Sequence, residues 1–283
     1  MRQPTLRAQW LGRHLRVLRE EAGLTLKDTA TFLQRDPSTV SRIETAEYSI
    51  RRPEVLGLLD FYNVSDGRRR ATLMKLGEEV WQKDWWDQYV DERGKQFANF
   101  VWLEARASDI QSFDNVVVPG LLQTQEYAEA IMRAADPDSA EAQIQSWIDL
   151  RMRRQEVLDR ADPPQITMLL DESVLRRQVG SAALSRRQLE HLLVSADRPR
   201  VSLRVLPLTI GLHPGATAAF VIFGMPDPYP EIGYVEALAG ALYLEPPETE
   251  PLLRAYERVD RHALNPAESV RLIARVAKEV ERQ

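Results

Sequence analysis

The sequence contains no cysteine among its 283 residues. Disulfide bonds, zinc–thiolate centres and iron–sulfur clusters are therefore excluded within this chain, because each of them needs cysteine sulfur. The four histidines are scattered and show no HExxH spacing, so we expect neither a metal site nor a cofactor.

Long apolar runs are also absent from the sequence. No segment approaches the ~20 consecutive apolar residues that a membrane-spanning helix needs, and the first residues lack the pattern of a secretory signal peptide. We therefore expect a cytoplasmic protein that has no membrane partner and that, on DNA, is associated with the nucleoid.

The common catalytic fingerprints are missing as well. The chain has no GxSxG, P-loop or dinucleotide-binding motif. Carboxylates at predicted strand ends and two histidines are the candidates for acid–base chemistry: Asp171, Glu172, Glu236, His191 and His213. Such carboxylates more often cap helices or pair with arginines, so we expect that the protein is not an enzyme.

The charge is distributed unevenly along the chain. The whole sequence has a net charge of −5, which by itself argues against a nucleic-acid partner. Residues 1–76, however, carry 14 basic and 9 acidic residues, a net charge of +5, whereas the remainder carries 23 and 33, a net charge of −10. A basic segment joined to an acidic body is typical of a DNA-binding domain with a separate second domain.

The basic segment has the pattern of a bundle of short helices. Apolar residues at helical spacing predict a first helix over 10–21, ended by Gly23: Trp10, Leu11, His14, Leu15, Val17 and Leu18. Thr25 and Asp28 form a capping box for a second helix, whose inner face is Leu26, Ala30 and Leu33. A fourth helix opens near Pro53 and buries four residues: Val55, Leu58, Leu59 and Tyr62.

Residues 36–44 predict the helix that reads DNA. Asp36 can cap this helix, and Pro37 suits its first turn, where no backbone N–H is needed. Val40 and Ile43 are three residues apart and face inward. The outer side is then left to small hydroxyl residues and one arginine: Ser38, Thr39, Ser41 and Arg42. Small residues allow close approach to a major groove, and arginine is the commonest bidentate partner of guanine.

This order of helices resembles the Xre/Cro-type helix-turn-helix repressors. The matching residues are Leu15, Leu18, Arg19, Gly23, Leu24, Ala30, Val40, Ile43 and Glu44. The resemblance implies double-stranded DNA as partner, an ion pair between Arg19 and Glu44, and base contacts by four residues: Pro37, Ser38, Ser41 and Arg42. The chain departs from the family's pattern at Leu26, because the family usually has a glutamine there that contacts the DNA backbone.

Phosphate contacts are expected from hydroxyl and basic residues around the recognition helix and near the start of the chain. The candidates are Thr39, Arg51, Arg52, Arg13, Arg2 and Arg7. The run at residues 68–70 lies beyond the module, and we expect it to be a solvated helix face.

Four of the six tryptophans lie within 22 residues: Trp81, Trp85, Trp86 and Trp102. Such a cluster could be a base-stacking platform or a ligand cage, but it is more often a packing or dimer contact, because tryptophan buries a large area. We therefore expect a symmetric homodimer formed through Trp81, Trp85 and Trp86. A weaker candidate is the C-terminal helix with Ile273 and Val276.

The rest of the chain predicts an α+β architecture. Residues 65–112 have a helical pattern, broken near Gly94. Strands are predicted over 165–170, 201–206, 218–223, 232–236 and 241–244. The first two are expected to be parallel and the last three antiparallel, with a helix opening at a capping box formed by Ser185 and Gln188 and a last helix capped by Asn265. The predicted domains are an all-α helix-turn-helix bundle (1–76), a helical linker and dimerisation segment (77–112) and a mixed-sheet α+β domain (113–283).

The second part of the chain resembles the C-terminal domain of actinobacterial WhiJ-like, antitoxin-like regulators. The matching residues include Val118–Thr124, Tyr127-Ala128, Arg151, Arg154-Gln155, Asp171-Glu172, Leu175–Arg177, Val179-Gly180, Gln188-Leu189, Val205–Pro207, Gly215, Phe220 and Tyr234–Glu236. The resemblance implies a regulator that receives a small partner protein. The alternative is a small-molecule sensor with a pocket bordered by Val118–Thr124 and Gly211–Gly215.

Overall fold

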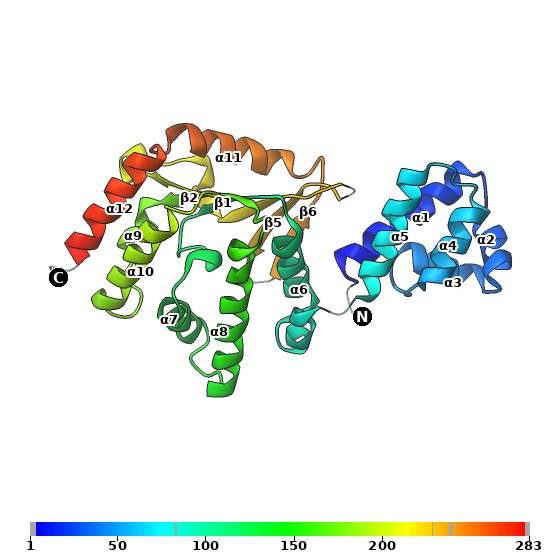
Figure 1. Ribbon diagram of the computed structural model, residues 1–283, viewed down its shortest axis with the longest axis horizontal. Helices are drawn as coiled ribbons and strands as arrows, with labels where there is room; N and C mark the ends of the chain where they lie inside the picture. The colour runs from blue at the N-terminus through cyan, green and yellow to red at the C-terminus, as the bar shows by residue number, and fades with distance from the viewer. Residues whose placement is uncertain (1–3, 83, 228, 238–239, 281–283) are drawn as a thin grey trace. The chain divides into compact units, whose positions relative to one another are not determined.

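The computed structural model describes residues 4–82, 84–227, 229–237 and 240–280 (Figure 1). The chain divides between Asn99 and Phe100 into an N-terminal unit and a C-terminal unit, which we describe separately. Within the described residues, no helix has both the length and the apolar character needed to cross a membrane.

The N-terminal unit is helical, as predicted. Its elements are α1 (Leu6–Glu21), α2 (Leu26–Leu33), α3 (Pro37–Glu44), α4 (Arg52–Phe61), α5 (Gly67–Trp81), the 3-10 helix η1 (Trp85–Tyr89) and the first part of α6 (Val90–Arg106). The core consists of apolar side chains from all five of the first helices, among them Leu11, Leu15, Val40, Leu59 and Leu73.

Helix α1 differs from the prediction at its start and on one face. It begins at Leu6 rather than residue 10, because the Thr5 side chain caps it by accepting from the Ala8 backbone N–H. Val17, predicted to face inward, is exposed, since Leu15 and Leu18 fill the space towards the core.

Residues 65–114 differ from the sequence prediction in three places. Helix α6 runs through Gly94 without interruption, and the helical pattern is instead broken between Trp81 and Trp85. Residues 109–114 form strand β1 rather than the end of a helix. Pairing with a strand on each side supplies the backbone hydrogen bonds of β1, and this tertiary context outweighs a weak local pattern. The predicted boundary at residue 76 falls inside α5, which packs on α1 and α4.

The C-terminal unit is built on one mixed sheet with the order β3-β2-β1-β4-β5-β6. Its strands are β1 (Asp109–Asp114), β2 (Gln165–Asp171), β3 (Val201–Leu206), β4 (Phe220–Gly224), β5 (Ile232–Ala237) and β6 (Gly240–Leu244). Strands β1, β2 and β3 are parallel, with Ile110 opposite Ile166, and β4 to β6 are antiparallel. The sequence predicted the parallel pair β2 and β3 and the antiparallel β4 to β6, but not β1. The α+β fold class is therefore confirmed.

Helices cover both faces of this sheet (Figure 1). The helical elements are η2 (Gly120–Leu122), α7 (Gln125–Ala135), α8 (Glu141–Gln155), η3 (Glu156–Asp159), α9 (Glu172–Arg176), α10 (Ala182–Ser195), η4 (Leu208–Ile210), η5 (Pro214–Thr217), α11 (Glu250–His262) and α12 (Pro266–Val280). Helix α11 lies on one face, where Tyr256 and Val259 pack against Phe113 and Leu169. Helices α6, α8 and α10 lie on the other, and α12 packs along β3 and α10.

Of the two capping boxes predicted in this unit, the one at Asn265 is confirmed and the one at Ser185 is wrong. Asn265 and Glu268 exchange the two hydrogen bonds of a capping box at the start of α12, as predicted. The box predicted at Ser185 is wrong: α10 begins at Ala182 and is capped by Ser181. Ser185 is buried inside the helix, where its hydroxyl bonds the Val179 backbone instead.

Candidate DNA-binding interface

Helices α2 and α3 form the two arms of a helix-turn-helix. The Thr25 and Asp28 capping box at the start of α2 is confirmed. The turn between the helices is tight because Gln34 adopts a left-handed conformation with φ of 54°. Asp36 stands at the N-cap of α3 but makes no side-chain hydrogen bond there, so Pro37 in the first turn is the local signal that starts this helix.

The outer face of α3 carries the residues predicted to contact bases. Val40 and Ile43 are buried, which turns the opposite side of the helix outward. Pro37, Ser38 and Arg42 are exposed, and Ser41 and Thr39 are half-buried. One Arg42 Nη donates to the Thr39 hydroxyl at 3.4 Å, a long contact that leaves the rest of the guanidinium available to a ligand.

Arg19 on α1 and Glu44 at the end of α3 are brought together by the fold. Arg19 Nε and Nη2 donate to the two carboxylate oxygens of Glu44 at 2.6 and 3.0 Å, while Nη1 donates to the Leu24 carbonyl at 2.9 Å. The two side chains are only 10% and 6% exposed. The hydrogen bonds to Glu44 raise the pKa of Arg19 above its usual value. This bidentate pair fixes the end of α3 against α1.

Gly12 on α1 provides a second contact with the end of α3, which the sequence analysis missed. A Cβ added at Gly12 would lie 2.5 Å from the Glu44 carbonyl oxygen and 2.7 Å from that of Ile43. The two helices therefore approach closer than any residue with a side chain allows. A glycine inside an otherwise apolar helical pattern is the signal that could have revealed this crossing.

The residues predicted to bind phosphate fall into three groups. Arg51 and Arg52 are exposed at the start of α4, where Arg52 Nε also contacts Glu78 at 2.6 Å. Arg13 is exposed on α1. Arg7 is a correction: it is buried, and its Nη1 donates to the Glu79 carbonyl at 2.8 Å, so it ties α1 to α5. Arg2 lies outside the described residues.

Three further arginines of this unit have structural partners. Arg35, in the turn before α3, donates to Glu54 and lies over the Tyr48 ring. Arg69 pairs with Glu21, and Arg70 pairs with Asp60. The run at residues 68–70 is therefore not simply a solvated face, because two of its members link α5 to α1 and α4.

The tryptophans predicted as one cluster are divided by the fold. Trp86 is buried and meets Trp85 edge-on at 5.4 Å, whereas Trp81 is 52% exposed and its indole N–H donates to the Ile50 carbonyl at 2.7 Å. Trp102 belongs to the C-terminal unit, where it is buried and meets Tyr229 edge-on. Trp81, Trp85 and Trp86 therefore belong to the N-terminal unit and Trp102 to the core of the C-terminal unit.

Of the groups considered for acid–base chemistry, two meet in the structure. His213 Nε2 lies 3.3 Å from an Asp171 carboxylate oxygen at the end of β2. Glu172 accepts from Arg176 and from the Leu208 backbone N–H. His191 lies on α10, where burial lowers its pKa, and Glu236 is exposed on β5. Among the described residues, no cluster of three or more His, Asp or Glu is suited to holding a metal ion.

The segment Val118–Thr124 is clamped rather than open. Gln188 donates to the Leu122 carbonyl and accepts from the Thr124 N–H, both at 2.7 Å. Gln123 donates to the Val118 carbonyl and accepts from Arg151. These hydrogen bonds hold the connection between β1 and α7 in place.

A helix-turn-helix with an outward recognition helix, joined to a separate α+β domain, defines a DNA-binding protein. Residues 10–73 match the family described as Helix-turn-helix domain. Residues 97–275 match the family described as Domain of unknown function (DUF5753), and because this match covers more than half of the chain, the protein belongs to that family. Neither a curated protein nor a solved structure matches the chain significantly.

Proposed function

We propose that this protein is a sequence-specific transcriptional regulator that reads the major groove with α3. The observation that carries the proposal is the outer face of α3, where Ser38, Ser41 and Arg42 stand on a helix whose end is fixed by Arg19 and Glu44. A preorganised helix with small side chains and one arginine suits close approach to base edges. Arg51, Arg52 and Arg13 would contact the flanking phosphates, together with Thr39.

The regulator would act as a symmetric homodimer that places two recognition helices on adjacent half-sites. Trp81 supports this part of the proposal, because it is exposed beside an open depression of about 490 Å³. Gly77, Glu78 and Gln82 also line this depression, and so do Arg51 and Arg52, which places the dimer contact next to the proposed phosphate contacts. Trp86 is buried within its own unit, and Ile273 and Val276 are buried in the C-terminal unit. Their side chains are therefore not exposed to a second copy of the chain, and we do not propose them as dimer contacts.

The C-terminal unit would receive a small partner protein, as the resemblance to the WhiJ-like, antitoxin-like class implies. The support is an ordered apolar loop: Leu208, Ile210 and Leu212 are exposed, and Leu212 is 93% exposed. Glu172 and Asp171 anchor this loop through Leu208 and His213. Large apolar side chains held towards solvent are typical of an interaction site. The hydrogen bonds from Gln188 and Arg151 that fix the Val118–Thr124 segment favour a structural role for it, and so favour a partner protein over a small-molecule ligand for this unit.

Three experiments test this proposal. Selection of DNA from a random pool by the full chain should yield a palindromic site, and light scattering should give the mass of a dimer. If the selected DNA shows no sequence preference, the proposed role in reading DNA sequence is contradicted. Co-purification from the native cell should yield a small protein that Leu212→Asp releases and that Val194→Asp, the matched change at an exposed residue of α10, retains.

A further inference from the structure

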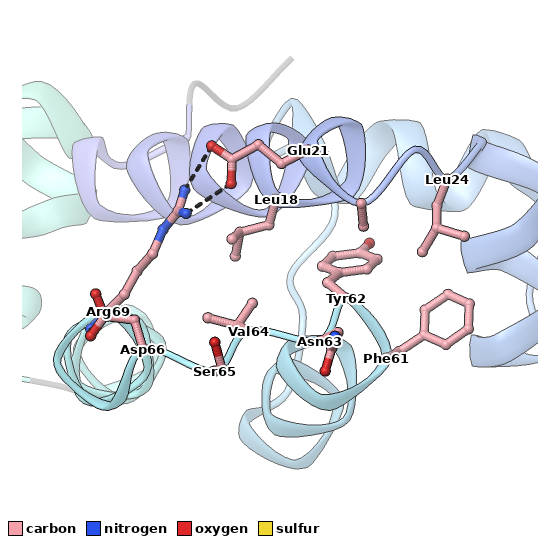
Figure 2. Close-up of a pocket in the computed structure, with 11 residues that line it drawn as sticks. Leu18, Glu21, Leu24, Phe61, Tyr62, Asn63, Val64, Ser65, Asp66 and Arg69 are labelled. Carbon is pink, nitrogen blue, oxygen red and sulfur yellow. Dashed lines mark hydrogen bonds and ion pairs between the residues drawn. The ribbon is translucent and has the colours of Figure 1, made fainter.

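The N-terminal unit contains a recess that is not part of the outer face of α3. It has a volume of about 530 Å³ and lies between the ends of α1 and α4 and the start of α5 (Figure 2). The residues that line it are Leu18, Glu21, Ala22, Leu24, Phe61, Tyr62, Asn63, Val64, Ser65, Asp66 and Arg69. A recess of this size is large enough for a small organic molecule.

One end of the recess is polar and the other is apolar. Figure 2 shows Glu21 and Arg69 facing each other at one end, Phe61 and Leu24 at the opposite end, and the Tyr62 ring between them. Leu18 and Val64, both buried, form part of the wall. This arrangement suits a molecule with a charged group at one end and an aromatic or branched aliphatic group at the other.

The electrostatics of the recess favour a cation. Helices α1 and α4 both end here, at Glu21 and Phe61, and helix C-termini carry partial negative charge. The N-terminus of α5 also borders the recess and is partly positive, but the Asp66 carboxylate caps it by accepting from the Arg68 and Arg69 backbone N–H groups. Two carboxylates, Glu21 and Asp66, line the recess against one guanidinium, that of Arg69. This excess of negative charge is local, because residues 1–76 as a whole are basic.

The polar end can exchange its partner at low cost. Arg69 donates to Glu21 at 2.8 and 3.3 Å, and the two side chains are 38% and 53% exposed. An ion pair with this exposure is weak because water screens it. A ligand cation can therefore take the place of Arg69 at Glu21. The pKa of Glu21 is lowered by its hydrogen bond from Arg69, so the carboxylate is ionised at neutral pH in the free protein.

The walls of the recess are joined directly to the DNA-reading helices. The Leu24 carbonyl accepts from Arg19, the residue that holds Glu44 at the end of α3. The Tyr62 hydroxyl lies 3.2 Å from the Thr29 hydroxyl on α2. Phe61 stacks on Phe32 of α2 with ring centroids 4.4 Å apart. A molecule that shifts Leu24, Tyr62 or Phe61 therefore acts on α2 and α3 through direct contacts.

We propose that this recess is an effector site for a small amphipathic organic amine, and that its occupancy changes the affinity of α3 for DNA. The amine contacts Glu21 and Asp66, and its apolar group lies between Tyr62, Phe61 and Leu24. The effector role rests on the proposed DNA-binding function, but binding of the amine can be measured without DNA.

The first experiment measures binding by NMR on the full chain with 2-phenylethylamine as the probe. The amine should shift the Leu24 and Val64 methyl resonances saturably, whereas 2-phenylethanol and phenylacetate, which lack the positive charge, should not at the same concentration. Glu21→Gln should weaken amine binding by roughly 3-fold or more, and Glu47→Gln, at an exposed glutamate outside the recess, should leave it unchanged. Equal binding of all three probes, or no effect of Glu21→Gln, overturns the site.

The second experiment measures the coupling to DNA. Saturating 2-phenylethylamine should change the Kd for the selected DNA site by about 5-fold or more, and bound DNA should change the affinity for the amine by the same factor. Ethylamine at equal concentration controls for ionic strength, which by itself weakens DNA binding. Amine binding without a change in Kd overturns the effector role. If the chain binds the amine but no DNA, the proposed DNA-binding function is contradicted, whereas the amine site in the recess is still supported by the first experiment.

Discussion

The backbone of Gly12 lies against the last carbonyl groups of the recognition helix, so close that a Cβ on Gly12 would stand 2.5 Å from the Glu44 carbonyl oxygen. Real Cβ atoms do not make this contact, and the obstacle is backbone rather than a movable side chain. The distance between α1 and α3, and with it the position of the DNA-reading face, therefore depends on the absence of one side chain.

Gly12→Ala should push α3 away from α1. We expect a loss of about 1–3 kcal/mol in the free energy of unfolding, typical of overpacking, although alanine is the better helix former. DNA affinity should fall together with stability. Gly67→Ala is the matched control, because nothing lies within 4 Å of its added Cβ, and it should be neutral or slightly stabilising. Urea unfolding of both variants measures the difference, and equal stabilities would show that the crossing is not tight.

Arg19→Met should destabilise the N-terminal unit by leaving the Glu44 carboxylate buried without its partner. Breaking a fully buried pair costs about 3–5 kcal/mol, and the residual exposure of these side chains places the expected loss towards the lower end. Arg16→Met, which removes an exposed arginine of the same helix, should change stability little. A double-mutant cycle with Glu44→Gln measures the coupling, and additive effects would contradict a paired role.

Arg42→Ala should weaken binding to the selected site by about 1–3 kcal/mol and relax the preference at one base position. Arg42→Lys keeps the charge but not the fork of donors, so it should retain the salt dependence of binding while losing the same preference. Repeating the DNA selection with each variant measures this. An unchanged preference in both variants would show that Arg42 does not face a base edge.

The C-terminal unit should become less stable as the pH rises through neutrality. Burial raises the pKa of Asp114 to about 7. The hydrogen bond from the Ser112 hydroxyl lowers this pKa, but by less than burial raises it. Because the folded-state pKa lies above the unfolded value of about 3.9, the protonated form favours folding. That contribution is complete below about pH 4 and is lost as the pH rises through the folded-state pKa.

Asp114→Asn tests this pH dependence because asparagine cannot ionise. Urea unfolding between pH 5 and pH 8.5, followed by a signal from the C-terminal unit, should show a smaller loss of stability in Asp114→Asn than in the unaltered protein. Asp197→Asn changes an exposed aspartate and should keep the original profile. The prediction fails if the free energy of unfolding changes with pH equally in Asp114→Asn and Asp197→Asn.

The helix-turn-helix could be predicted from the sequence because its signals are local. The Thr25 and Asp28 capping box, Pro37 at the start of α3 and the inward pair Val40 and Ile43 each act within one or two helical turns. Strand β2 could be predicted for a similar reason, since a buried strand in a parallel sheet is a nearly continuous apolar run. Strand β3 could be predicted from the alternation of its apolar residues Val201, Leu203 and Val205 with polar ones.

Strand β1 could not be predicted in this way. Only two of its six residues, Ile110 and Phe113, are apolar, and their spacing of three also fits a helix. The strand is stabilised by β2 on one side and β4 on the other, both far away in the sequence. The same limit applied to Gln188, which looked like half of a capping box. Its partners, Leu122 and Thr124, are more than sixty residues away, and a sequence pattern does not contain such a contact.

The sequence by itself determined the first four helices of the N-terminal unit, where the recognition helix begins and which of its faces is outward, because caps and periodicity act over a few residues. Only the tertiary structure decided what those helices do to one another. In the tertiary structure Arg7 is buried instead of being exposed for phosphate, Trp102 belongs to the core of a different unit from Trp81, and Gly12 lies against the carbonyl of Glu44. These outcomes depend on how distant segments pack, and close packing is decided by shape across the whole unit rather than by any local pattern.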